Sequence, residues 1–79
     1  MKNLAFIPKT VHGTVGDEVK WVNQDTAPHN VTYVSGPKFA SSSTLSTGQQ
    51  FSHVFSEPGT IQYFCSIHPF MKATLIVTK

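Results

Sequence analysis

Three side chains that can bind a metal lie close together near the end of the sequence. Cys65 is the only cysteine of the chain, His68 follows three residues later, and Met71 follows three residues after that. A single cysteine has no partner for a disulfide within the chain, so Cys65 is core filler, a nucleophile or a metal ligand. Because the loop between Cys65 and Met71 is short, it can fold all three side chains around one point.

A fourth ligand has to come from elsewhere in the chain, and His29 is the candidate. It follows Pro28 and opens a predicted strand. Two imidazoles and a thiolate with a weak axial thioether are typical of blue-copper electron-transfer sites. The soft sulfur ligands suit Cu(I) and the imidazoles accept Cu(II), so a geometry between the two preferences lowers the reorganisation on electron transfer. The residue types therefore indicate a copper centre.

Other interpretations of the same residues remain open at this point. Free cysteines are often buried structural thiols. A catalytic cysteine needs a base and an oxyanion hole, to which Met71 contributes nothing. Structural zinc sites prefer four Cys or His ligands, so we expect zinc only as an adventitious occupant. Of the other histidines, we expect His53 to pack in the core and His12 to be exposed, and neither to bind metal.

The elements that must position these residues are predicted from the hydrophobic pattern. Short runs in which every second residue faces the same side, bounded by Gly and Pro, indicate β-strands rather than helices. The clearest predicted strands are 19–23, 29–34, 51–55, 61–65 and 73–79. Six or seven short strands in one domain, residues 1–79, predict a small all-β sandwich.

Two parts of the chain have weaker patterns. A further strand pair is expected at about 4–7 and 10–15, interrupted by Pro8. The segment 35–50 has small polar residues and no periodicity, and it is about as long as a structureless loop usually becomes in a compact domain. We expect at most a short turn or edge strand there, around Phe39 or Leu45.

Composition argues against a nucleic-acid-binding protein, and the hydrophobic pattern argues against a membrane-spanning helix. Charged residues are 13 % of the 79 residues, and the net charge is +2 from six Lys, no Arg and four acidic residues. A nucleic-acid-binding protein would show clustered Lys and Arg, so we expect no nucleic-acid partner. No apolar run approaches the ~20 residues that a membrane-spanning helix needs.

Two long stretches resemble the cupredoxin family, in particular its plastocyanin-like and amicyanin-like members. The first is "FIPKTVHGTVGDEVKWVNQDTAPHNVT", with an F-x-P start, a G-D turn, a W-x-N strand end and a P-H-N-V ligand strand. The second is "FSHVFSEPGTIQYFCSIHPFMKATLIV", which ends in a C-x2-H-P-x-M ligand loop. The resemblance covers nearly the whole chain, and the motifs taken together are highly specific.

The resemblance implies a Greek-key β-sandwich that binds one copper ion. It implies His29, Cys65 and His68 as equatorial ligands and Met71 as the axial ligand. It further implies a type 1 copper protein that shuttles one electron between redox partners through Cu(II) and Cu(I), and not an enzyme. Two alternatives remain: a copper-binding or delivery protein with an exchangeable site, and a metal-free β-sandwich interaction module.

The resemblance also predicts residues around the ligands. Asn30 and Ser66 are expected to hydrogen-bond and tie the two ligand loops together, with the Asn30 N–H directed at the Cys65 sulfur, and such contacts fix the orientation of ligands. Ile67 stands where related loops often carry Pro. It keeps an N–H, so a second hydrogen bond to the thiolate is expected to stabilise Cu(I) and raise the reduction potential.

The expected docking surface surrounds His68. Phe70 follows Pro69 on the ligand loop, and with Pro28 these residues are expected to form an apolar collar around His68. Redox partner proteins would dock there weakly and briefly, with the chain itself a monomer. By resemblance we expect a periplasmic or other extracytoplasmic location, with any signal or anchor segment outside this sequence.

Overall fold

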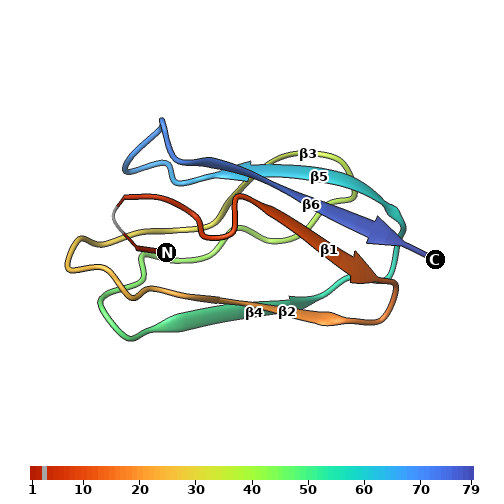
Figure 1. The fold of residues 1–79 in the computed structure, drawn as a ribbon, viewed down its shortest axis with the longest axis horizontal. Helices are drawn as coiled ribbons and strands as arrows, with labels where there is room; N and C mark the ends of the chain where they lie inside the picture. Colours follow the sequence, from red (N-terminus) through yellow and green to blue (C-terminus); the bar gives the residue numbers. More distant parts are fainter. Residues whose placement is uncertain (3) are drawn as a thin grey trace.

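The computed structural model describes residues 1–2 and 4–79, which form two packed β-sheets, as Figure 1 shows. Within these residues there are six strands and no helix. The strands are β1 (Thr10–Thr14), β2 (Glu18–Val22), β3 (Thr32–Ser35), β4 (Gln50–Val54), β5 (Gly59–Phe64) and β6 (Lys72–Thr78). The predicted all-β sandwich is confirmed, with six strands. No helix in this part of the chain has the length and apolar character needed to cross a membrane.

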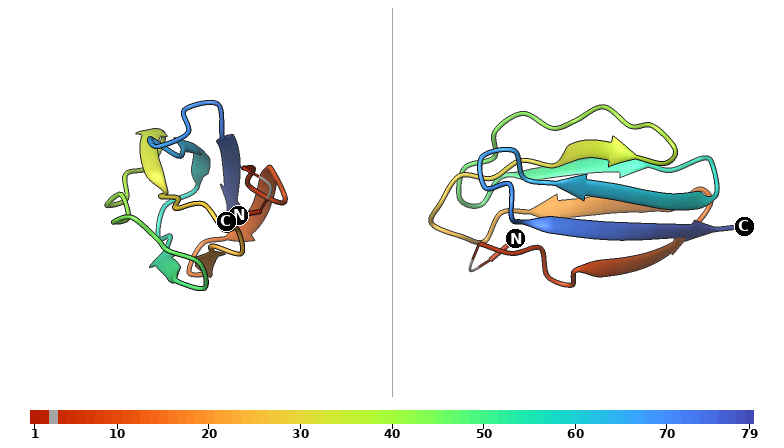
Figure 2. Two further views of the ribbon diagram at one scale, coloured as in Figure 1. Left: turned by 90° about the vertical axis from the view of Figure 1, so that its left-hand side faces the viewer. Right: turned by 90° about the horizontal axis from the view of Figure 1, so that it is seen from above.

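The larger sheet has the strand order β1-β6-β5-β3, and the smaller sheet pairs β2 with β4. β1 runs parallel to β6, whereas the other pairs are antiparallel. In Figure 1 the connections β2–β3 and β5–β6 lie at the same end of the sandwich, and the right-hand view of Figure 2 shows the same arrangement from above. The loops that carry His29 and Cys65 therefore meet at one end.

The expected alternation of buried and exposed residues explains how the two sheets pack. In β5 and β6 the buried side chains are Ile61, Tyr63, Ala73, Leu75 and Val77. From the opposite sheet, Trp21 is 6 % exposed and its ring centroid lies 5.4 Å from that of Tyr63. Apolar area removed from water is the main stabilising term in a domain of this size. Packing in the core between the two sheets therefore fixes the strands from which the loops extend.

The strand predicted at 4–7 is wrong. Ala5 forms only an isolated bridge with Lys2, and Leu4 has a φ of +55°, so the segment turns instead of extending. β1, which corresponds to the expected strand 10–15, pairs with β6. The apolar pattern at the start of the chain has a different cause, because Phe6 packs edge-on against Tyr63 in the core.

The strand predicted at 29–34 begins only at Thr32. Upstream of it, the backbone of His29 pairs with Leu45 as an isolated bridge, and so does not join the larger sheet. This bridge is the short edge-like element expected near Leu45 in the polar segment. It brings the middle of a long loop against the residue predicted to bind metal.

Candidate metal centre

Cys65 follows the last residue of β5 and turns into the core. It is fully buried, on the same side of the chain as Ile61 and Tyr63. The Cys65 N–H donates to the Met71 carbonyl at 3.0 Å, and the His68 N–H donates to the Cys65 carbonyl at 3.2 Å. The Met71 N–H donates to the His68 carbonyl at 2.8 Å. These three backbone bonds close the loop, so the spacing seen in the sequence becomes a compact turn.

His29 reaches the same place from the other loop. Two backbone hydrogen bonds with Leu45, at 3.1 and 2.7 Å, hold its main chain. The His29 side chain has no exposed surface, whereas the His68 side chain is half-buried. The two imidazole centroids are 5.0 Å apart, with an angle of 61° between the ring planes. One histidine is therefore internal, and the other lies at the surface.

Three potential ligand atoms converge. The Nδ1 atoms of His29 and His68 each lie 3.8 Å from the Cys65 sulfur. The three atoms all lie within 4.8 Å of one another. A metal with bonds of about 2.3 Å to sulfur and about 2.0 Å to nitrogen would separate a sulfur and a nitrogen ligand by about 3.7 Å at a trigonal angle and about 3.5 Å at a tetrahedral one. The two sulfur–nitrogen distances fit a trigonal Cys–His–His site, the arrangement that copper takes in electron-transfer proteins.

Met71, the expected axial ligand, is 2 % exposed and belongs to the same buried cluster as Cys65. Its backbone position is set by the bonds that close the loop. A thioether in this apolar setting is a soft, weak ligand and packs well whether or not it binds a metal. Its role as a ligand remains a prediction.

The two loops are joined by the Asn30 and Ser66 pair. Asn30 donates from Nδ2 to the Ser66 hydroxyl at 2.8 Å, and the Ser66 N–H donates to Asn30 Oδ1 at 2.9 Å. The Asn30 N–H donates to the Cys65 sulfur at 3.5 Å. The structure thus contains the hydrogen bonds expected from the sequence. They hold the His29 loop at a fixed distance from the Cys65 loop.

Ile67 lies on the ligand loop next to Ser66, whereas the remaining histidines, His12 and His53, lie in strands β1 and β4. Ile67 is 42 % exposed, and among the described residues Asn30 is the backbone donor to the Cys65 sulfur. The expected second hydrogen bond from Ile67 stays a prediction for the metal-bound protein. His12 is exposed, and His53 is half-buried with its ring 4.7 Å from that of Phe55.

Of the three expected collar residues, Phe70 is the one whose ring lies against His68, and the collar as a whole stays a prediction. Pro28 and Pro69 are exposed, and Phe70 has 66 % of its surface exposed. The Phe70 ring centroid is 6.0 Å from that of His68. A large aromatic side chain left in water beside a half-buried imidazole is a feature of contact surfaces.

Sequence reasoning missed Asp25, whose carboxylate lies against His29. Asp25 Oδ2 is 3.0 Å from His29 Nε2 and also accepts the Leu4 N–H at 2.8 Å. The hydrogen bond from Leu4, followed by that from His29, lowers the pKa of Asp25 to about 2. The carboxylate is therefore ionised over the whole physiological range. The available signal was an acid four residues before a candidate ligand, but spacing in a loop does not place a side chain.

Asn23 was also missed as a contributor to the site, although it ends the W-x-N motif. It is fully buried and donates from Nδ2 to the carbonyls of Ala27 at 2.9 Å and Leu45 at 2.8 Å. Its Oδ1 accepts the Asp25 N–H at 2.8 Å. Asn23 thereby shapes the loop that presents both Asp25 and His29.

Comparison with known proteins gives consistent matches. The family of copper-binding proteins that contains plastocyanin and azurin matches residues 1–78. Amicyanin-alpha of Methylorubrum extorquens is 42 % identical over 77 residues, covering 94 % of this chain and 65 % of that protein. Amicyanin of Paracoccus denitrificans is 37 % identical over 70 residues, covering 85 % of this chain and 53 % of that protein.

Solved structures agree. A structure described as a novel purple cupredoxin from Nitrosopumilus maritimus is 34 % identical, with a TM-score of 0.85 over 91 % of this chain and 80 % of that one. The chain spans between about half and two thirds of the length of the two amicyanins. The family match nevertheless covers nearly all of this sequence, and the converging donors are of the type that copper takes. The chain belongs to the plastocyanin/azurin family of copper-binding proteins.

Proposed function

We propose that residues 1–79 act as one cupredoxin-like domain that binds a single copper ion and carries electrons between redox partner proteins. The observation that carries this proposal is the convergence of the Cys65 sulfur and the Nδ1 atoms of His29 and His68, at 3.8 Å from sulfur to each nitrogen. Met71 would complete the ligand set through its thioether sulfur. When bound, copper supplies a Cu(II)/Cu(I) couple that takes up and releases one electron.

The protein residues keep this site dry and fixed. His29, Cys65 and Met71 are each 2 % exposed or less, so water has little access to these three side chains. The bridge between Asn30 and Ser66 holds the two loops at one separation. A rigid site with little solvent changes shape least when its charge changes, which favours electron transfer. The same burial argues against an open, exchangeable delivery site.

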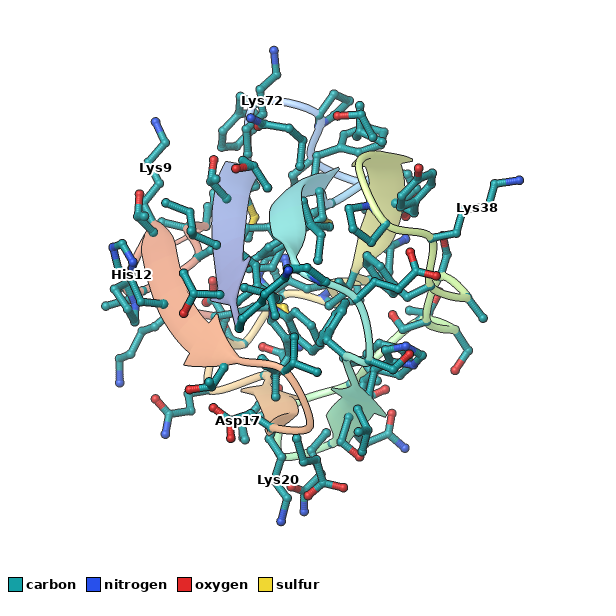
Figure 3. The ribbon with its side chains drawn as sticks, turned by 90° about the vertical axis from the view of Figure 1, so that its right-hand side faces the viewer. Lys9, His12, Asp17, Lys20, Lys38 and Lys72 are labelled. Carbon is teal, nitrogen blue, oxygen red and sulfur yellow. The ribbon has the colours of Figure 1, made fainter. Side chains whose placement is uncertain are left out.

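His68 is the member of the ligand set with exposed surface, so electron exchange is expected there. Pro28, Pro69 and Phe70 supply the apolar surface around it. The labelled lysines in Figure 3 point outward from several different elements and do not gather in one patch. A small apolar surface with few charges suits weak, short-lived docking by partner proteins. We infer a monomeric carrier that neither catalyses a reaction nor binds nucleic acid.

A carrier of this kind fits a periplasmic or other extracytoplasmic location. The thiol pool of the cytosol competes for copper with a site that has a single thiolate ligand. This assignment depends on the copper site and on family membership, and it is tested by localising the native protein in fractionated cells.

The deciding experiment is a Cu(II) titration followed by visible absorption. We expect an intense thiolate-to-copper band that saturates at one equivalent and bleaches with ascorbate. Cys65→Ser should abolish this band, whereas His12→Ala is the matched control because His12 is an exposed histidine outside the cluster. An unchanged spectrum on adding Cu(II) would instead indicate a metal-free module.

A competition with a chelator separates the carrier from a delivery protein. The carrier should retain copper against a chelator of modest affinity in both oxidation states and should cycle reversibly in voltammetry. Ready loss of copper to that chelator would support delivery instead. An identical absorption response in wild type and Cys65→Ser would refute the site.

A further inference from the structure

The buried ligand His29 has a contact on the side of its ring that faces away from the cluster. Its Nδ1 lies 3.8 Å from the Cys65 sulfur, and its Nε2 lies 3.0 Å from Asp25 Oδ2. The imidazole has no exposed surface, and the Asp25 side chain is 14 % exposed. A neutral imidazole carries its proton on one nitrogen only, so a carboxylate at Nε2 keeps the proton there and leaves Nδ1 free to bind a metal.

Asp25 is itself held in place from several directions. Its Oδ1 accepts the Thr26 N–H at 2.8 Å, and its own N–H donates to Asn23 Oδ1 at 2.8 Å. The Thr47 hydroxyl donates to its carbonyl at 2.6 Å. A residue whose backbone and carboxylate both form hydrogen bonds has little freedom to move away. Its position against His29 is therefore built into the loop.

The remaining contact comes from the start of the chain. The Leu4 N–H donates to Asp25 Oδ2, the same oxygen that faces His29, at 2.8 Å. Leu4 lies in a turn closed by two backbone bonds between Lys2 and Ala5, at 3.0 and 3.1 Å. Met1 fastens this turn to the end of β2, because its amino group donates to the Val22 carbonyl at 2.8 Å. The left-hand view of Figure 2 looks onto the end of the sandwich that carries the ligand loops, and the N-terminus is marked in it.

We propose that Asp25 is the positioning residue of His29 and that the N-terminal turn, which contains Lys2, Leu4 and Ala5 and donates through the Leu4 N–H, helps to support the metal centre. One carboxylate oxygen is shared between the ligand and the turn. The turn aims the carboxylate, the carboxylate fixes the tautomer and orientation of the imidazole, and its negative charge makes Nδ1 a stronger donor. This inference rests on the proposed copper site, but the contact itself exists in the metal-free protein.

The effect on the metal has a definite direction. A more basic imidazole stabilises Cu(II) more than Cu(I), because the ion of higher charge gains more from a stronger nitrogen donor. Removing the carboxylate should therefore raise the reduction potential and weaken Cu(II) binding. Loss of such supporting partners typically costs roughly 10–100-fold in metal affinity.

The first test uses the metal-free protein, where copper binding plays no part. In wild type, nitrogen and proton NMR of the His29 ring should show a single tautomer with a slowly exchanging Nε2 proton, and the Leu4 amide should be protected from exchange. Asp25→Ala should give faster exchange at both positions. Asp25→Glu keeps the charge and should restore part of the protection. Asp25→Asn keeps the size of the side chain and serves if the alanine variant does not fold.

The second test measures Cu(II) affinity by competition and the potential by voltammetry. We expect roughly 10–100-fold weaker binding and a higher potential in Asp25→Asn, with Asp25→Glu in between. Asp17→Asn is the matched control, because Asp17 likewise accepts a backbone N–H, from Thr14 at 2.8 Å, but in the turn between β1 and β2. Asp17 is labelled in Figure 3, which views the end opposite to the ligand loops.

The outcomes are distinct. If the Asp25 variants match Asp17→Asn in ring proton exchange, affinity and potential, the proposal is overturned. A fall in stability with unchanged ring signals would also overturn it, because Asp25 would then only brace the loop. If wild type binds no copper but the ring signals change as expected, the proposed function fails while the contact between Asp25 and His29 stands.

Discussion

Asn30 and Ser66 are 36 positions apart in the sequence and bind each other through two hydrogen bonds, of 2.8 and 2.9 Å. One bond uses the amide nitrogen of Asn30 and the other its amide oxygen, so a single side chain ties the loop of the internal histidine to that of the cysteine. The Asn30 backbone N–H also donates to the Cys65 sulfur. The ligand loops are thus fixed to each other without a metal.

Asn30→Ala should therefore destabilise the metal-free protein. It removes both hydrogen bonds and leaves the part-buried groups on Ser66 without partners, which costs about 1–3 kcal/mol. Urea unfolding of the metal-free protein measures the effect. Ser66→Ala, which removes only the hydroxyl partner, should cost less. Ser52→Ala, on the exposed face of β4, is the control and should change the free energy of unfolding by less than about 0.5 kcal/mol. Equal stability of Asn30→Ala and Ser52→Ala would contradict the assigned role.

Met71→Leu should separate the packing role of this side chain from its role as a ligand. The two side chains are of similar volume, so the cost in core stability should stay below about 1.5 kcal/mol. Loss of the weak axial thioether should leave copper bound, while the charge-transfer spectrum shifts and the potential rises, since Cu(II) loses a donor. Spectra and voltammetry that match wild type would show that Met71 only fills the core.

Phe70→Glu should slow electron exchange without disturbing the fold. Phe70 is 66 % exposed beside His68, so a carboxylate there costs little stability but places like charges face to face when two copies meet. Electron self-exchange between the Cu(I) and Cu(II) forms of this chain, measured by NMR line broadening, requires no identified partner. We expect a several-fold slower rate. Val54→Glu is the control, since Val54 is 51 % exposed on β4 of the smaller sheet. Equal slowing in both variants would point to net charge and not to the collar around His68.

Tyr63 should make the metal-free protein sensitive to alkaline pH. Burial raises the pKa of its phenol above the ordinary value of 10.0, so the folded state holds the proton more tightly than the unfolded state. Because the pKa of the phenol is higher in the folded state than in the unfolded state, this contribution to stability is fully present below the unfolded pKa. It is lost as the pH rises above about 10. Urea unfolding at several alkaline pH values should show a steeper fall in wild type than in Tyr63→Phe. Parallel curves for the two proteins would refute the assignment.

The strands were largely predictable from the sequence because each depends on a local pattern. Alternating apolar residues predicted β5 and β6 to within two residues at their ends. The same kind of pattern wrongly predicted a strand at 4–7, where the apolar residues belong to a turn that covers the core. Period-two spacing reports which residues are buried, and it does not report whether the backbone between them is extended.

Part of the candidate site was also predictable, because it depends on residues that are close together in the sequence. The compact loop from Cys65 to Met71 follows from local spacing, and the sequence alone, read with its resemblance to cupredoxins, named His29, His68 and the pair of Asn30 and Ser66. What the tertiary structure decided was the distance across the loops, the bridge from His29 to Leu45, and the contact of Asp25 with both His29 and the N-terminal turn. Those relationships join segments distant in sequence, and only packing of the two sheets sets where their loops meet.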